Sequence, residues 1–208
     1  MSRPETRVLS EEWDTNRRLA ELGLSRDGLL RARDIAMNGR DNTGPYHCAN
    51  SPGTYSHHEG VAGIREQFVG AVWELCRSDG IEGIRHAENR MKVGFQNVDI
   101  AHNLLHDPRP RSEKGSGAER AAEGNLFGDL PRHYKADAVS AGTPLYYLMV
   151  APDGACELSL PIIRNGKFDG FVERIFLDDG KDNDGEKLPL TDDSDTVSSF
   201  DVPISKKG

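Results

Sequence analysis

The spacing of apolar residues changes once along the chain, and this change constrains the fold more than any other feature. In the N-terminal part apolar side chains recur every three or four residues, most clearly through residues 61–75, where Val61, Ile64 and Phe68 share one helical face. From Ile81 onward apolar and polar residues alternate, as in a strand with one buried face. This order predicts an α+β fold in which about three N-terminal helices pack on a mostly antiparallel sheet.

Capping and turn residues indicate where the helices begin and end. Ser10 and Ser25 are expected to cap two helices, which end near Gly23 and at the pair Asn38–Gly39. The helical spacing of the third segment continues as far as Cys76. We therefore expect a short helical hairpin followed by one longer helix.

Strand patterns occupy five later segments, which are residues 81–85, 91–100, 145–150, 156–163 and 168–177. Asn165–Gly166 separates the last two segments and is the typical two-residue connection of a β-hairpin. The sheet is therefore expected to have about five strands. Two long loops, at residues 39–55 and 101–143, interrupt the regular elements.

Charge divides the chain into a nearly neutral body and an acidic tail. Residues 178–208 hold nine acidic and four basic residues, so −5 of the net charge of −8 lies there. We expect one α+β domain over residues 1–177, followed by a flexible acidic tail over residues 178–208. A body whose net charge is close to zero is not typical of a general nucleic-acid binder, because contacts with phosphates need a basic face. A local basic patch remains compatible with this composition.

The cysteines and the apolar runs indicate the compartment. Cys48, Cys76 and Cys156 are odd in number and widely spaced, which predicts neither a disulfide framework nor a zinc knuckle. The first residues are charged, and no apolar run approaches the roughly 20 residues that span a membrane. These features predict a soluble, cytoplasmic protein with no membrane association.

The segment of residues 46–60 is rich in reactive side chains. Ser56 and Glu59 have the spacing of a capping box, which predicts that the third helix begins at Ser56 and that His57 and His58 are its first helical residues. His47 lies in the preceding loop. All three histidines are candidate catalytic residues, and His57 and His58 are also candidate metal ligands. The alternative is a polar loop that simply ends in a helix cap.

A second candidate metal site follows the segment 91–100. Asp99 lies at the end of this segment, and His102 and His106 would share one face if the chain were helical there. Asn103 occupies the position where a zincin motif has its glutamate, so the general base of that motif is missing. The alternative is a loop or short helix in which Leu104 and Leu105 pack inward.

A glycine-rich basic stretch in the second long loop is a candidate phosphate cradle. It has a Gly-Ser-Gly turn before a predicted short helix at residues 117–123, but it lacks the order of a Walker A loop. The alternative is a solvated loop with ordinary charges. The candidate ligand-binding residues are Arg109, Arg111, Lys114, Ser116 and Arg120.

Two functional hypotheses remain open from the sequence. The first is a domain that binds or hydrolyses a phosphate-bearing ligand, such as a nucleotide or a nucleic acid, with the loop histidines as acid–base groups and a divalent metal as the candidate cofactor. The second is a non-enzymatic protein that contacts a protein partner through its long loops and acidic tail. The first depends on convergence of the loops at one site, which a sequence does not reveal.

Overall fold

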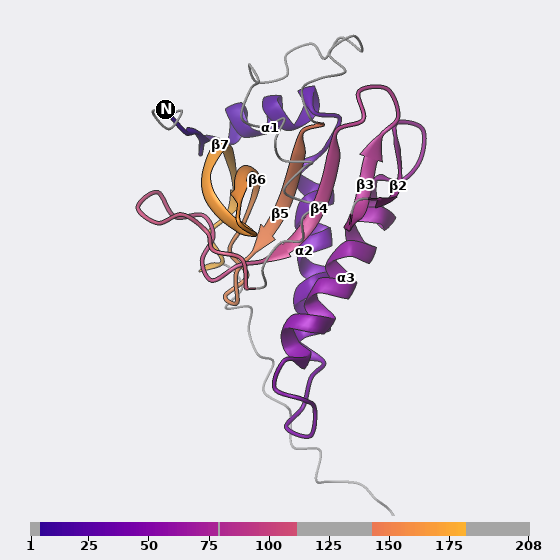
Figure 1. Ribbon diagram of the computed structural model, residues 1–208, viewed down its shortest axis with the longest axis vertical. Coiled ribbons are helices and arrows are strands. Elements are labelled where there is room, and N and C mark those ends of the chain that lie inside the picture. Colours follow the sequence, from indigo (N-terminus) through magenta and orange to yellow (C-terminus); the bar gives the residue numbers. More distant parts are fainter. Residues whose placement is uncertain (1–4, 79, 112–142, 182–208) are drawn as a thin grey trace, which may run out of the picture.

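The computed structural model describes residues 5–78, 80–111 and 143–181, which form three helices and a seven-stranded sheet (Figure 1). The helices are α1 (Glu12–Glu21), α2 (Arg26–Asp41) and α3 (Ser51–Phe68). The strands are β1 (Arg7–Leu9), β2 (Trp73–Ser78), β3 (Ile81–His86), β4 (Lys92–Asn97), β5 (Leu145–Val150), β6 (Cys156–Arg164) and β7 (Lys167–Asp178). The predicted short helix at residues 117–123 and most of the predicted tail lie outside the described residues.

The strand order across the sheet is β1-β7-β6-β5-β4-β3-β2. Neighbouring strands are antiparallel except for β4–β5 and β1–β7, which are parallel. The predicted α+β class and the mostly antiparallel sheet are therefore confirmed. The predicted count of about five strands is wrong because β1 and β2 extend the sheet at its two ends, and β1, with three residues, is too short for an alternating pattern to show.

The third predicted helix is wrong at both ends. α3 begins at Ser51, with Asn50 as its N-cap and Pro52 in its first turn, where a missing N–H costs nothing. It ends at Phe68, because Val69 adopts an extended conformation (φ −64°, ψ 126°) and the chain then turns into β2. The apolar spacing continues across this boundary, but in β2 Trp73 is buried whereas Leu75 is 52% exposed.

The Ser56 capping box is therefore also a wrong prediction. Ser56 lies inside α3 and is buried, and its hydroxyl donates a hydrogen bond to Asn97 Oδ1 over 2.9 Å. Ser25 does cap α2, since its hydroxyl accepts a hydrogen bond from Gly28 N over 3.2 Å. The α2 cap was predictable because Gly23 ends the preceding helix two residues before Ser25. Ser56, in contrast, comes five residues after the start of α3 at Ser51, so it lies inside a helix that has already begun.

Small residues let α2, α3 and β4 lie close together. A Cβ on Gly63 of α3 would lie 3.0 Å from the backbone of Ala32 in α2, and one on Gly39 would lie 2.6 Å from Glu59 Cγ. This packing explains why α2 continues to Asp41 instead of ending at Gly39. On the sheet side, the ring of Phe95 in β4 fills the space that a side chain at Gly60 would need.

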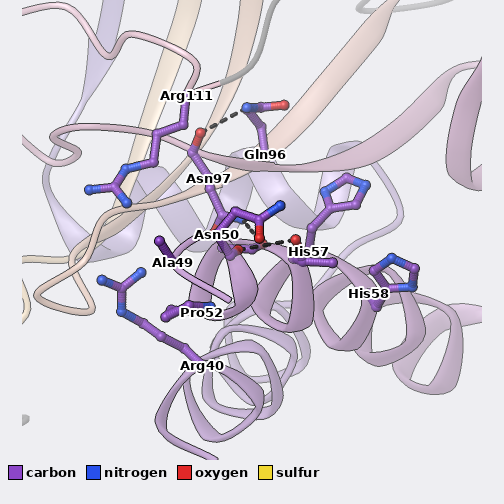
Figure 2. Close-up of a pocket in the computed structure, with 11 residues that line it drawn as sticks. Arg40, Ala49, Asn50, Pro52, His57, His58, Gln96, Asn97 and Arg111 are labelled. Atoms are coloured by element: carbon purple, nitrogen blue, oxygen red, sulfur yellow. Dashed lines mark hydrogen bonds between the residues drawn. The ribbon is translucent and has the colours of Figure 1, made fainter. Parts of the chain in front are cut away.

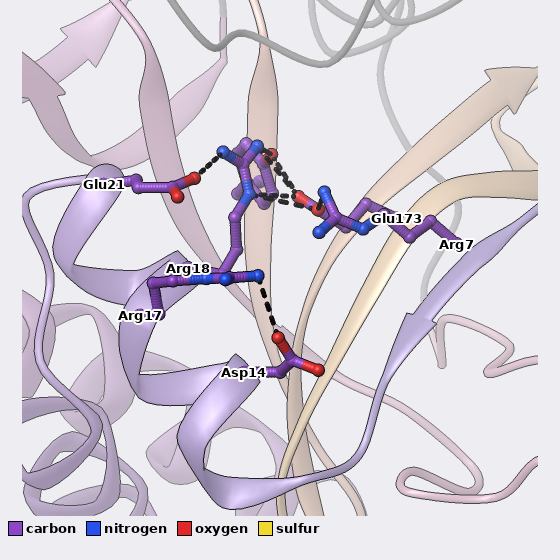
Figure 3. Close-up of polar contacts among 7 residues, drawn as sticks. Arg7, Asp14, Arg17, Arg18, Glu21 and Glu173 are labelled. Carbon is purple, nitrogen blue, oxygen red and sulfur yellow. Dashed lines mark hydrogen bonds and ion pairs between the residues drawn. The ribbon is translucent and has the colours of Figure 1, made fainter.

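Two buried ion pairs lie on opposite faces of the sheet. Glu173 and Arg174 are consecutive residues of β7, so their side chains point to opposite faces. On the helix side, Arg18 of α1 donates to Glu173 over 3.1 Å, and Tyr146 Oη donates to the same carboxylate over 2.8 Å (Figure 3). Burial, with the neighbouring Glu173 carboxylate, raises the pKa of Tyr146. On the other face Arg174 Nη2 lies 2.7 Å from Glu157 Oε2.

The final hairpin forms as the sequence predicts. Asn165 and Gly166 have φ values of 52° and 71°, as a tight hairpin turn between β6 and β7 requires. Asparagine and glycine tolerate this left-handed conformation better than other residues. The turn therefore sets the pairing of β6 with β7 next to it, and three register shifts alter this pairing further along the two strands.

Replacing Gly60 by alanine tests the close contact between α3 and β4. The new Cβ would lie 2.4 Å from the Phe95 ring, so we expect G60A to lower the free energy of unfolding by about 1–3 kcal/mol in spite of the better helix propensity of alanine. Urea denaturation measures the change. Gly70→Ala is the matched control, because a Cβ at Gly70 meets no atom within 4 Å. Equal stabilities of the two variants would contradict the contact.

Replacing Glu173 by glutamine tests the buried ion pair. E173Q removes the buried carboxylate that pairs with Arg18 and leaves the half-exposed Glu21 as its remaining acidic partner among the described residues, so we expect a loss of about 3 kcal/mol in the free energy of unfolding. Asp14→Asn, which removes the more exposed Arg17–Asp14 pair, is the control and should cost less than about 1 kcal/mol. If the double variant Arg18→Met, Glu173→Leu were less stable than E173Q, the loss would not arise from an unpaired charge.

Candidate functional site

A pocket of about 510 Å³ opens where the start of α3 meets the end of β4 (Figure 2). Its walls come from the last turn of α2, the segment before α3, the first two turns of α3, the end of β4 and the segment after β4. The described lining residues are Arg40, Ala49, Asn50, Pro52, Gly53, Thr54, His57, His58, Gln96, Asn97 and Arg111. The volume falls within the roughly 300–1,000 Å³ that is typical of small-molecule sites.

The charge lining this pocket is positive. Arg40 enters from the end of α2, and Arg111 enters from the segment after β4, while none of the described lining residues is acidic. Within the described parts of the chain, neither guanidinium group forms an ion pair or a side-chain hydrogen bond. Arginines that lack a carboxylate partner and face a pocket are suited to bind an anion, because a guanidinium presents several N–H donors in a fixed plane.

The first turn of α3 adds to this positive character. Ser51 N donates to Cys48 O over 2.9 Å and Thr54 N donates to Asn50 O over 3.0 Å, while Pro52 has no N–H. Among the described residues this leaves the Gly53 N–H as the open donor of the first turn. An open N–H at the positive end of a helix favours an anion in the pocket.

His57 and His58 line the opposite part of the pocket. They lie in the second turn of α3, so the prediction that they begin the helix is wrong. The His57 ring is half-buried with its centroid 6.0 Å from that of Phe95, and the His58 ring is exposed. The two imidazole centroids are 6.3 Å apart and the rings are nearly perpendicular. The structure thus brings the two candidate histidines into one pocket with Arg111.

Asn97 holds the walls of the pocket together. Its Nδ2 donates to Gly53 O over 2.8 Å, and its Oδ1 accepts from Ser56 Oγ over 2.9 Å. Its backbone oxygen accepts from Gln96 Nε2 over 2.7 Å and from Arg111 N over 3.2 Å. One residue at the end of β4 therefore fixes both the start of α3 and the backbone of Arg111.

Of the eleven described residues that line this pocket, the sequence predicted three and missed eight, among them Arg40, Asn50, Gln96 and Asn97. The sequence Asn50-Ser51-Pro52 carried a usable signal, because an N-cap residue followed by proline in the first turn marks a helix start. Arg40 carries no such signal, since the sequence places it in the polar loop of residues 39–55 as an ordinary solvated charge. Asn97 is recognisable only once the sheet and α3 are in contact.

Two predicted residues lie outside the pocket. His47 is exposed in the segment before α3, where its Nδ1 accepts a hydrogen bond from Gly44 N over 2.9 Å. Arg109 is also exposed and does not line the pocket, although it is close in sequence to Arg111. Three further predicted ligands, Lys114, Ser116 and Arg120, lie outside the described residues.

The predicted metal site at Asp99, His102 and His106 does not form. Residues 101–108 are not helical, and His102 has a φ of 52°, so the two histidines do not share a helical face. Asp99 instead closes the loop, because its Oδ1 accepts hydrogen bonds from Ile100 N and Arg109 N over 2.8 and 2.7 Å. In the part of the chain that the structure describes, no group of three or more His, Cys, Asp or Glu side chains is arranged to hold a metal ion.

The chain matches no family model, no curated protein and no solved structure. None of the described helices is long and apolar enough to cross a membrane. The geometry and charge of the pocket are therefore the features that point to a function.

The three cysteines differ in exposure, which gives a test by pH. Cys48 is exposed, whereas burial raises the pKa of the Cys156 thiol from 9.0 to about 12. At a pH between 9 and 12 the Cys156 thiol keeps its proton in the folded protein and loses it on unfolding. The free energy of unfolding therefore falls as the pH rises through this range. We expect Cys156→Ala to reduce this fall by up to about 1.4 kcal/mol per pH unit. Urea denaturation at pH 8 and pH 10.5 with a reductant measures it, and equal slopes in the two proteins would contradict the buried thiol.

Proposed function

We propose that the pocket at the start of α3 binds a small phosphate-bearing ligand. The observation that carries this proposal is the pair of arginines, Arg40 and Arg111, which line one pocket. No acidic residue is among the described lining residues, and neither arginine has an ion-pair partner in the described chain. The open N–H of Gly53 adds a backbone donor to the same pocket. Phosphate oxygens accept hydrogen bonds from such groups, and the full charge of the ligand strengthens each bond.

The modest volume of the pocket favours a small molecule over a nucleic acid. A nucleic-acid site needs positive charge along an extended groove, whereas here the two arginines converge on a volume of about 510 Å³ in a chain of net charge −8. His57 and His58 line the same pocket and are able to donate, accept or transfer a proton. The proposal therefore keeps the phosphate ligand of the first hypothesis but transfers its binding from the glycine-rich stretch to Arg40 and Arg111.

Alanine substitutions of the two arginines test this proposal with inorganic phosphate as the probe. We expect Arg40→Ala and Arg111→Ala each to weaken phosphate binding about tenfold or more, since a hydrogen bond to a charged group contributes about 1.5–3 kcal/mol. Isothermal titration calorimetry at low salt measures the affinity. Arg109→Ala is the matched control, because Arg109 is an exposed arginine of the same segment that does not line the pocket.

Two outcomes would contradict the proposal. One is the absence of phosphate binding by the unaltered protein at millimolar concentration. The other is an equal loss of affinity in the Arg109 variant, which would indicate a general effect of charge. Thermal denaturation of all three variants checks that they remain folded, and little change in melting temperature is expected because neither Arg40 nor Arg111 forms a side-chain hydrogen bond or ion pair in the described chain.

The second hypothesis, contact with a protein partner, is favoured by exposed apolar side chains in both loops. The segment between α2 and α3 carries Tyr46, whose side chain is 101% exposed, and Leu104 and Leu105 in the second loop are 70% and 87% exposed. However, α2 ends at Asp41 and α3 begins at Ser51, so the first long loop is shorter than the sequence predicted. These few exposed side chains support this hypothesis less than the pocket supports the first.

A further inference from the structure

The pocket has two chemically different halves. Arg40 and Arg111 lie on one side, His57 and His58 lie on the other, and Asn50 and Asn97 are between them (Figure 2). The arginines come from α2 and from the segment after β4, whereas both histidines come from the second turn of α3. A ligand that spans this pocket therefore meets two cations at one end and neutral polar groups at the other.

The side chains of the two halves differ in what they recognise. A guanidinium only donates hydrogen bonds, so the arginine half accepts an anion. An amide both donates and accepts, and so does a neutral imidazole, which makes the other half suited to hydroxyl groups. A second anionic group would find no arginine among the described residues of that half.

Asn50 is the amide that remains available to a ligand. Asn97 uses its side chain on Gly53 O and Ser56 Oγ, so it shapes the pocket but has little capacity left. Asn50 is the N-cap residue of α3, yet its side chain makes no capping hydrogen bond and none with any other described residue. An N-cap asparagine normally bonds to the helix that it caps, so this exposed amide is free to bind a ligand.

We propose that the ligand is a phosphorylated sugar unit, with its phosphate at Arg40 and Arg111 and its hydroxyl groups at Asn50 and His58. This inference rests on the proposed function, because it requires the phosphate to lie in the arginine half. The volume of about 510 Å³ leaves room beyond the phosphate for a sugar. The same unit occurs in free sugar phosphates and in nucleotides, and both satisfy the chemistry of the two halves.

The test compares two ligands that differ only in the sugar. Ribose 5-phosphate and inorganic phosphate are titrated into the full chain by calorimetry, and the ratio of their affinities is the readout. We expect ribose 5-phosphate to bind at least tenfold more tightly than phosphate to the unaltered protein. Asn50→Ser, which keeps a good N-cap residue, and His58→Phe, which keeps the ring, should each reduce this ratio several-fold.

The arms of the experiment separate the possible failures. Arg40→Ala should weaken both ligands and leave their ratio nearly unchanged; if it weakens neither, the proposed function fails. If Arg40→Ala weakens both but the unaltered protein binds them equally, the sugar inference alone is overturned. An unaltered ratio in both Asn50→Ser and His58→Phe would also overturn it. Adenosine 5′-monophosphate identifies the source: tighter binding than ribose 5-phosphate indicates a nucleotide, and equal binding indicates the free sugar phosphate.

Discussion

The close approach of α3 to the end of β4 is the contact on which the rest of the site depends. Gly60 allows the Phe95 ring to lie directly against the helix, and Asn97 joins the end of the strand to the first two turns of α3. If α3 were displaced outward, Gly53, His57 and His58 would move away from Arg111. The pocket is therefore a product of helix-on-sheet packing, and its shape is set by apolar and amide contacts that do not themselves carry charge.

The arginines of the core have carboxylate partners, whereas the arginines of the pocket have none in the described chain. Arg18 and Arg174 are almost completely buried, and each is paired with a glutamate that is also buried. Such pairs contribute little net stability, because desolvation offsets their attraction, but an unpaired member would be costly. Arg40 and Arg111 have no such partner in the described chain and are at least partly open to solvent. The contrast distinguishes arginines that belong to the architecture from arginines that are available to a ligand.

Local chemistry in the sequence predicted part of the fold, although Ser10 and Ser56 cap no helix, since the N-cap residues of α1 and α3 are Glu11 and Asn50. The Ser25 cap and the Asn165–Gly166 turn formed as expected, because each acts through bonds to residues a few positions away. The end of α3 was not predictable from spacing, since residues from Val61 to Leu75 keep a helical period although the chain becomes extended at Val69. The pocket was predicted only in part: His57, His58 and Arg111 were identified, whereas Arg40 and Asn97 become relevant only through tertiary contacts between distant segments.

The sheet also links the two ends of the described chain. β1 pairs with β7, and the Arg18 guanidinium of α1 bonds to a carboxylate that lies 155 positions further along the chain. Contacts of such long range are slow to form, because the intervening chain must lose its conformational freedom first. During synthesis α1 emerges early with its Arg18–Glu21 ion pair, but the buried carboxylate of Glu173 joins Arg18 only when β7 has followed. The domain is thus expected to complete its folding only after nearly the whole sheet has left the ribosome, as one late and cooperative event.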